Sequence, residues 1–258
     1  MINYKYSVIM TFPTKNWEVY GKYSLPSFDK YWPKDIQAYV YLEGDQNIPY
    51  EPSERVHILN FDDHIFGATA FAEKYKDKDI FDDVVDGDIS KRQAVKFSKK
   101  VYAQLQELRN PRSQYVIYLD ADLMTLQKIP MKLLDNLTTG DHYVAFPDRR
   151  IRNKFTETGM LIWDTQHEYH SLWCFLYDSM YKEGKIFNCP EWHDCYAFDT
   201  ATFDLERKGL IKCADLGYGS NSRHPLVAGP LGAYFDHMKG GRKFNGYSKE
   251  RVQAHGHV

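Results

Sequence analysis

Two aspartates separated by a single residue are the strongest sign of chemistry in this sequence. Residues 115–119 favour a strand that is covered on both faces, and Asp120 and Asp122 follow them directly. In an extended backbone alternate side chains share a face, so the two carboxylates point the same way. Close carboxylates repel unless a cation lies between them, and oxygen ligands suit Mg²⁺ or Mn²⁺. We therefore expect a metal site here, with an acidic turn after a core strand as the plain alternative.

A second pattern near the C-terminus adds weight to the metal site. His237, Gly240 and Lys243 follow one another at steps of three residues. A neutral imidazole can complete a carboxylate metal site, and mixed oxygen and nitrogen ligands favour Mn²⁺. The glycine lets a backbone approach a pyrophosphate, and the lysine can neutralise its charge. An isolated histidine is more often structural, but together with Asp120 and Asp122 it predicts one shared metal site.

The elements that must position these residues alternate between strands and helices. We expect strands at residues 5–12, 35–42, 55–61, 115–119, 143–146, 160–163 and 212–216, and helices at residues 90–108, 130–137, 167–182 and 194–208. The helix at 90–108 has the clearest apolar pattern, with steps of three and four residues. Strands that alternate with crossovers are typical of a parallel, nucleotide-binding sheet. The predicted fold class is therefore α/β, in which ligands bind at the carboxyl ends of the strands.

Length and charge limit the possible functions. The 258 residues are enough for one large α/β domain, and we predict a single domain over residues 1–258. The formal net charge is −2, so any contact with nucleic acid must come from a local patch. The acidic segment 62–88 breaks the alternation of strands and helices. We interpret it as an inserted flap, in the form of a solvated acidic loop, because its acids lack the spacing of a calcium-binding EF-hand.

The cysteines indicate a reducing compartment. Cys174, Cys189, Cys195 and Cys213 form no C-x-x-C pair, and the sequence has no secretory signal or apolar run of membrane-spanning length. We expect a soluble, cytoplasmic protein without a transmembrane segment. Cys189, His193 and Cys195 are close enough in sequence to suggest zinc. A fourth ligand is not evident, so buried thiols beside a loop are the favoured interpretation.

The two predicted metal-binding segments resemble those of GT-A glycosyltransferases, especially the retaining, family 8-like group that includes glycogenin and bacterial galactosyltransferases. Residues 119–122 match its D-x-D segment, and residues 237–243 match its H-x-x-G-x-x-K segment. The resemblance implies a Rossmann-like GT-A fold with a mostly parallel sheet, a Mn²⁺ or Mg²⁺ cofactor and a UDP-sugar donor. It makes Asp120, Asp122 and His237 the metal ligands and places Lys243 on the diphosphate.

Weaker similarity extends over most of the chain. Residues 158–162 resemble the strand after the acceptor loop of that family, and Asp194 resembles the acid that opens a later active-site segment. Two positions depart from the family pattern: Phe244-Asn245 replaces Pro-Trp, and Cys195 stands where a glutamine is common. These departures leave the sugar specificity and the stereochemical outcome open.

The implied reaction is transfer of a sugar, a hexose in this group, to an unidentified acceptor with retention of configuration. The metal and Lys243 would stabilise charge on the departing diphosphate, and Arg92 or Lys96 would add a further cation. Asp194 and Glu157 are the candidates for positioning or base chemistry, and either acid is also plausible as a structural residue.

Two further regions are candidates by position. The end of the first strand, Thr11 and Phe12 with nearby Tyr20, would hold the nucleotide base and ribose. Four cations lie in the loop that borders the acceptor side by resemblance: Arg149, Arg150, Arg152 and Lys154. They suit an anionic acceptor such as an acidic glycan, a lipid phosphate or a nucleic-acid backbone. A solvated loop is the alternative.

Two other functions remain open from the sequence. A nucleotidyltransferase acting on a sugar phosphate also pairs carboxylates with a metal and a basic phosphate contact. A non-catalytic module that binds nucleotides or glycans would use the same scaffold. Release of pyrophosphate from a nucleoside triphosphate would indicate the first, and binding without turnover the second.

Overall fold

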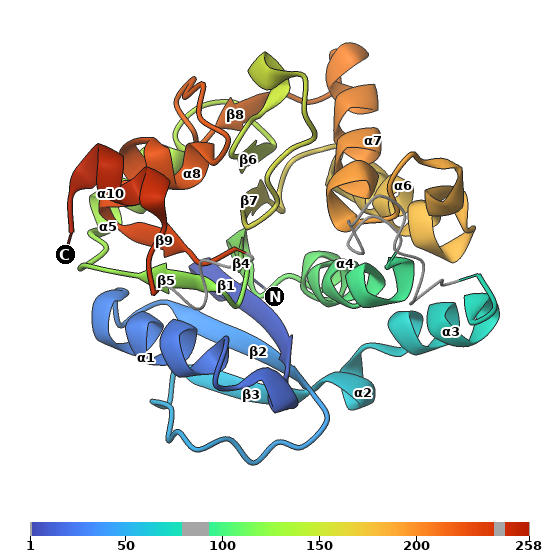
Figure 1. The fold of residues 1–258 in the computed structure, drawn as a ribbon. Coiled ribbons are helices and arrows are strands. Elements are labelled where there is room, and N and C mark those ends of the chain that lie inside the picture. The colour runs from blue at the N-terminus through green and yellow to red at the C-terminus, as the bar shows by residue number, and fades with distance from the viewer. Residues whose placement is uncertain (1, 79–92, 240–245, 258) are drawn as a thin grey trace.

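A computed structural model describes residues 2–78, 93–239 and 246–257 (Figure 1). Its main sheet has the strand order β3-β2-β1-β4-β7-β6-β8. These strands are β1 (Tyr4–Pro13), β2 (Gln37–Glu43), β3 (Val56–Asn60), β4 (Ser113–Leu119), β6 (Val144–Phe146), β7 (Met160–Asp164) and β8 (Cys213–Asp215). Strand β7 is antiparallel to β4 and β6, and the other neighbouring pairs are parallel. The predicted α/β class with a mostly parallel sheet is confirmed.

Helices cover both faces of this sheet (Figure 1). The helices are α1 (Gly21–Tyr31), α2 (Phe61–His64), α3 (Phe66–Tyr75), α4 (Ala94–Arg109), α5 (Met131–Thr138), α6 (His170–Lys182), α7 (Asp194–Arg207), α8 (Pro225–Ala228) and α10 (Lys249–His255). Helices α3, α4, α6 and α7 form one hydrophobic core with the sheet, and α1, α5 and α8 form the other.

Strand β4 contributes to both cores, which explains its continuous apolar sequence. Val116 and Tyr118 lie in the core under α4, whereas Ile117 and Leu119 lie in the core on the opposite face. Successive side chains of a strand point to opposite faces, so a strand between two helical layers needs apolar residues at every position. The run that identified this strand in the sequence is therefore a direct consequence of its central place in the sheet.

A small second sheet is important for the site. It consists of β5 (Leu123–Thr125) and β9 (Phe235–His237), which pair antiparallel. Strand β5 follows the two aspartates after β4, and β9 carries the histidine of the C-terminal pattern. Neither strand was predicted as such, because three residues are too few for a sequence pattern to show.

The expected solvated loop after β3 is wrong for its first part. Asp62 and Asp63 belong to α2, and α3 follows as far as Tyr75. The Asn60 side-chain oxygen caps α2 by accepting hydrogen bonds from the backbone N–H groups of Asp62 and Asp63, at 2.8 and 3.3 Å. Phe71 of α3 is buried in the core beside α4 and α6, so helix packing stabilises this segment. Residues 79–88 lie outside the described residues.

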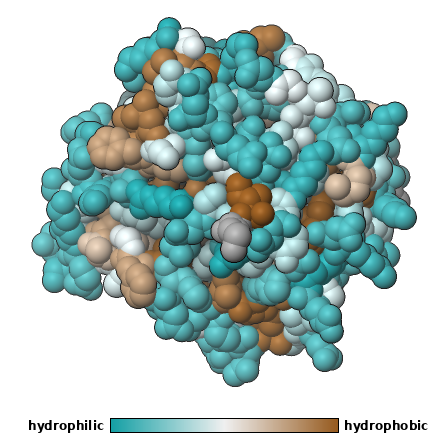
Figure 2. All heavy atoms as spheres, turned by 180° about the vertical axis from the view of Figure 1, so that it is seen from behind, coloured by the Kyte–Doolittle hydropathy of each residue, from teal (hydrophilic) through white to brown (hydrophobic). Residues whose placement is uncertain are grey.

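The surface shows no single large apolar patch in the view of Figure 2, where hydrophobic side chains form separate groups on a mainly hydrophilic face. Across the described ranges, no helix has the length and apolar character needed to cross a membrane. All four cysteines are free thiols.

Candidate active site

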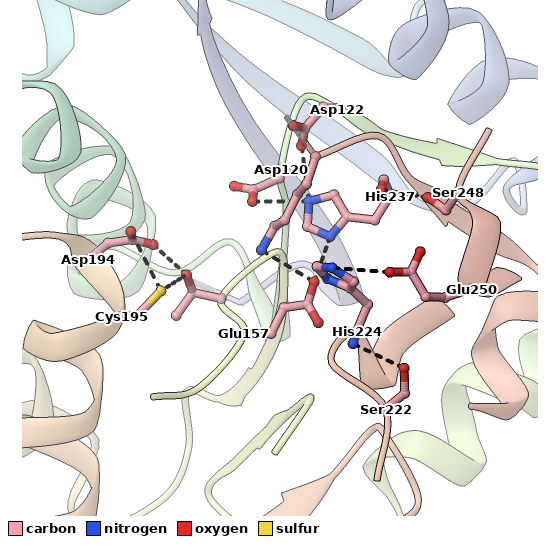
Figure 3. Close-up of polar contacts among 12 residues, drawn as sticks. Asp120, Asp122, Glu157, Asp194, Cys195, Ser222, His224, His237, Ser248 and Glu250 are labelled. Atoms are coloured by element: carbon pink, nitrogen blue, oxygen red, sulfur yellow. Dashed lines mark hydrogen bonds and ion pairs between the residues drawn. The ribbon is translucent and has the colours of Figure 1, made fainter. Parts of the chain in front are cut away.

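The two aspartates lie where β4 ends, and the β5–β9 pair brings the histidine to them. Leu123 of β5 pairs with His237 of β9, and the backbone N–H of Met238 donates to the Asp122 carbonyl at 2.9 Å. Asp120, Asp122 and His237 each offer a ligand atom, and these atoms lie within 4.8 Å of one another. The structure therefore assembles the three predicted metal ligands from segments more than a hundred residues apart (Figure 3).

Glu157 contacts the His237 imidazole at the ring nitrogen that does not face the two aspartates. Its Oε1 lies 3.0 Å from His237 Nδ1, while Nε2 of the same ring lies 3.0 Å from Asp122 Oδ1 and 3.5 Å from Asp120 Oδ2. Figure 3 shows the ring between Glu157 on one side and the two aspartates on the other. A carboxylate on the second ring nitrogen is the usual support of a ligating histidine.

The charge of His237 follows from these neighbours. Burial and the Lys239 ammonium lower the pKa of His237, but the carboxylates of Asp122 and Asp120 outweigh them and raise it to about 10. Without a metal, the imidazole therefore carries a proton at neutral pH. A divalent cation would have to displace that proton from Nε2.

Lys100 is the cation that α4 supplies to the site. Its Nζ lies 2.7 Å from Asp120 Oδ1 and 2.8 Å from Asp194 Oδ2. The same ammonium donates to the Thr158 carbonyl at 2.9 Å. Sequence analysis selected Arg92 or Lys96 for this role. Lys96 is exposed, and Arg92 lies outside the described residues.

Asp194 begins α7 and is almost completely buried, with 3% of its surface exposed. The Thr158 hydroxyl donates to its Oδ2, which also pairs with Lys100. Burial raises the pKa of Asp194, but the Lys100 ammonium outweighs that effect and holds the pKa below its ordinary value. Asp194 is therefore a fixed negative charge beside the predicted metal ligands.

The suggested zinc ligands are not brought together as a set. His193 groups with Asp194 and Cys195, whereas Cys189 lies outside this group within the part of the chain that the structure describes. Asp194 is already neutralised by Lys100. Burial and the neighbouring Asp194 raise the pKa of Cys195 to about 12, so its thiol is neutral. The interpretation as buried thiols beside a loop fits this geometry better than zinc.

Lys239 is a further cation that sequence analysis did not select. Its Nζ lies 3.3 Å from Glu157 Oε1. Burial lowers its pKa, but Glu157 and Asp120 outweigh that effect and raise it, so the amine is charged. Its position between His237 and Gly240 was the only available signal. Gly240 and Lys243, the rest of the C-terminal pattern, lie outside the described residues.

The candidate residues at the end of β1, Thr11, Phe12 and Tyr20, direct their side chains into contacts within the protein. The Thr11 hydroxyl donates to the Tyr41 carbonyl of β2 at 3.0 Å. Phe12 is buried and packs against Trp17. Tyr20 packs against the same core. The side chains of these three residues are thus engaged within the protein, and their predicted contact with a nucleotide base and ribose stays a prediction.

Two of the four loop cations already have protein partners. The Arg150 guanidinium pairs with Asp148 at 2.6 Å and with Glu206 at 2.5 Å. Arg152 Nη1 donates to the Asn221 carbonyl at 2.7 Å. Arg149 lies over the Phe155 ring, 5.1 Å from its centroid, and Lys154 is exposed. Arg149 and Lys154 are therefore the better candidates for contact with an acceptor.

Comparisons with known proteins identify the fold but no family. No protein-family model and no curated protein matches the chain. The bifunctional glycosyltransferase WbbM matches with a TM-score of 0.53 and 12% identity, over 84% of this chain and 40% of its own. The galactosyltransferase LgtC matches with a TM-score of 0.48 and 14% identity, over 85% of this chain and 81% of its own.

Mouse xyloside xylosyltransferase 1 is similar at a TM-score of 0.48 and 10% identity, over 83% of this chain and 86% of its own. The fold assignment rests on the sheet order and on WbbM, which has the highest TM-score of these three structures. The chain has the GT-A fold of nucleotide-sugar glycosyltransferases.

Proposed function

We propose that residues 1–258 act as one GT-A domain that transfers a hexose from a nucleoside diphosphate sugar, with UDP as the nucleotide, to an acceptor. The transfer would depend on a divalent metal and retain the anomeric configuration. The observation that carries this proposal is the cluster of Asp120, Asp122 and His237 at the carboxyl end of β4. Open α/β sheets bind their ligands at this edge. The retaining, family 8-like character rests on the H-x-x-G-x-x-K segment.

The residues present fit a manganese or magnesium ion. Two carboxylates and one imidazole form a mixed oxygen and nitrogen donor set, which favours Mn²⁺. Glu157 orients the imidazole as a ligating histidine requires. When bound, the metal would act as a Lewis acid that stabilises charge on the leaving diphosphate.

The chain's own residues then have separate tasks. Lys100 joins Asp120 to Asp194 and so fixes the metal-binding carboxylate relative to the acid that would orient the donor sugar. Lys239 and Lys243 would place positive charge near the diphosphate. Glu157 is fully buried and engaged by His237 and Lys239, so we assign it a positioning role in place of the base role that the sequence left open.

The test of the metal proposal is donor binding by calorimetry, with and without Mn²⁺. Asp120→Asn and Asp122→Asn should lose the Mn²⁺-dependent part of UDP-sugar binding. Asp135→Asn, which removes a surface ion pair with Lys5, is the matched control and should bind as the unchanged protein does. Equal affinity in all of these proteins would contradict the assignment.

Turnover assays separate this proposal from its alternatives. Slow hydrolysis of a UDP-sugar with Mn²⁺ supports sugar transfer. Release of pyrophosphate from a nucleoside triphosphate and a sugar phosphate would instead indicate a nucleotidyltransferase. Tight binding of either donor without any turnover would indicate a non-catalytic module.

The acceptor side is proposed to favour negative charge through Arg149 and Lys154, two loop cations that form no ion pair among the described residues. In a panel of acidic and neutral acceptors, Arg149→Glu combined with Lys154→Glu should raise KM for the acidic members only, and less so at high salt. Arg207→Glu, on an exposed side chain of α7, is the control. If the double variant keeps the same preference for acidic over neutral acceptors, these cations only form a solvated loop and do not contact the acceptor.

A further inference from the structure

A cavity lies on the other side of strand β9 from the predicted metal ligands. Its volume is about 550 Å³, within the range of about 300–1,000 Å³ that is typical of ligand sites. Residues of α1, β5, β9 and the C-terminal segment around α10 line it. Asp236 lines this cavity, whereas His237 faces the candidate active site. Successive strand side chains point to opposite faces, so β9 separates the two sites.

Tyrosines give this cavity an aromatic rim. Tyr23 of α1 and Tyr247 are 47% and 39% exposed, and Tyr31 lies in the same lining. Aromatic side chains with exposed faces offer a flat apolar surface with a polar end. The apolar faces of sugar rings are complementary to such a surface.

The charged residues of the lining are mostly cations. Lys22 and Lys30 lie on α1, and Arg251 lies on α10. The Arg251 side chain is buried, and its Nε and Nη1 donate to the carbonyls of Gly232 and Gly256, each at 2.9 Å. Lys22 forms an ion pair with Glu18 at the exposed surface, an interaction that competes weakly with a ligand.

One buried acid completes the lining. Asp236 is 2% exposed, and its Oδ2 accepts a hydrogen bond from the Ser248 backbone N–H at 3.0 Å. Its Oδ1 is buried and has no hydrogen-bond partner among the described residues. Because this carboxylate is buried beneath the lining, the exposed charges that a ligand would meet are those of Lys22 and Lys30.

We propose that this cavity binds an acidic oligosaccharide. Its sugar rings stack on Tyr23 and Tyr247, and its carboxylates face Lys22 and Lys30. The site lies behind the candidate active site and does not depend on the reaction proposed there. It would hold an acidic glycan on the protein independently of the donor.

The test measures binding of trigalacturonic acid at low salt, by saturation-transfer NMR and by calorimetry. Its fully methyl-esterified form has the same rings without the charges and should bind about tenfold more weakly. Lys22→Gln combined with Lys30→Gln should reduce the affinity for the acid to that of the ester. Tyr247→Ala should weaken both ligands about fivefold, as expected for one lost aromatic contact.

Two lysines far from the cavity provide a control. The control is Lys185→Gln combined with Lys208→Gln, which removes two exposed lysines elsewhere on the protein. Lys208 forms an i,i+4 ion pair as Lys22 does, and this double variant should bind the oligosaccharide with unchanged affinity. UDP-sugar binding with Mn²⁺ should be the same in all variants. Equal binding of acid and ester, or no binding of either, would overturn the proposal. Binding to phosphatidylglycerol vesicles that needs Lys22 and Lys30, without any oligosaccharide signal, would overturn it in favour of a lipid surface.

Discussion

At the scale of single residues, Lys100 has the most consequential position in the site. It lies between two carboxylates that would otherwise repel each other, Asp120 at the end of β4 and Asp194 at the start of α7. Both acids are largely buried, so each needs a partner charge to remain ionised. The lysine thereby connects the edge of the sheet that carries the predicted metal ligands to the helix on its flank.

Replacing Lys100 by methionine should therefore be costly. We expect a loss of about 3 kcal/mol in unfolding free energy, because two buried carboxylates lose their cation. Lys96→Met, one turn earlier on the same helix and exposed, should cost no more than about 0.5 kcal/mol. Denaturant unfolding measures both. Similar stability of the two variants would show that Lys100 is dispensable.

Glu157 offers a second test at this scale. Glu157→Gln keeps the shape of the side chain but removes the charge that faces His237 Nδ1. Loss of such a supporting carboxylate typically lowers metal affinity about 10- to 100-fold, and we expect that range for Mn²⁺ in a calorimetric titration. Glu191→Gln removes a comparable partner from His193, at 2.8 Å, and should leave Mn²⁺ binding intact. If Glu191→Gln weakens Mn²⁺ binding and Glu157→Gln does not, the metal ligand is His193 and the assignment to His237 is wrong.

At the scale of elements, short segments have decisive effects. The β5–β9 pair is only three residues long in each strand, yet it brings His237 to the aspartates. Helix α7 starts with Asp194 and carries Asp199 one turn further along. Asp199 accepts a hydrogen bond from the Thr156 backbone N–H at 3.1 Å, so it ties the helix to the loop before β7.

Asp199 should make stability depend on pH. Burial raises its pKa from 3.8 to about 7, despite hydrogen bonds from Thr156 that lower it. Between these values the folded state holds a proton that the unfolded state has lost, so stability falls as pH rises through this window. The shift corresponds to at most about 4 kcal/mol. Asp199→Asn should remove the fall in stability with pH over this window, and it should be more stable than the unchanged protein at pH 8.

Thermal unfolding between pH 4 and 8 measures this difference. The amide oxygen of asparagine can still accept from Thr156, so the fold should persist. Asp35→Asn, at an exposed acid, serves as the control and should follow the unchanged protein. Parallel profiles for Asp199→Asn and the unchanged protein would mean that this carboxyl is ionised throughout.

At the scale of the whole molecule, the fold brings Asp194 of α7 and Glu157 of the loop before β7 beside the predicted metal ligands. Asp194 is held by Lys100 and Thr158 and is not free to take a proton from an acceptor. Glu157 is buried against His237 and Lys239. With both acids engaged, the departing phosphate is the better proton acceptor, which agrees with retention.

Proton NMR of the first sugar released from an α-linked UDP-sugar tests this prediction. We expect the α anomer, and a β anomer would indicate inversion with a carboxylate base. Asp194→Asn should lower kcat about 100-fold or more, because a charge that stabilises the cationic transition state is lost. Asp178→Asn, a buried aspartate paired with Arg109 at 2.8 Å, is the control for general destabilisation.

The sequence by itself determined the local features of this protein. The apolar run of β4 depends only on backbone geometry over a few residues, and that prediction agrees with the structure. Asp120 and Asp122 do come together, but through a turn closed by the Leu123 N–H on the Asp120 carbonyl at 2.9 Å, and not through the extended backbone that the sequence suggested. The spacing of apolar residues also located α4, although not which of its lysines enters the site. His237 was recognised because its spacing to Gly240 and Lys243 resembles a known pattern.

Only the tertiary structure decided which distant residues meet. Lys100 rather than Lys96 reaches the site because α4 packs across the sheet with that face toward β4 and α7. Glu157 became the support of His237 because β9 pairs with β5 beside the loop before β7. The contacts of Lys100 with Asp194 and of Glu157 with His237 join residues that are 94 and 80 positions apart in the chain. Strand order and helix packing set such contacts, and no local pattern in the sequence encodes them.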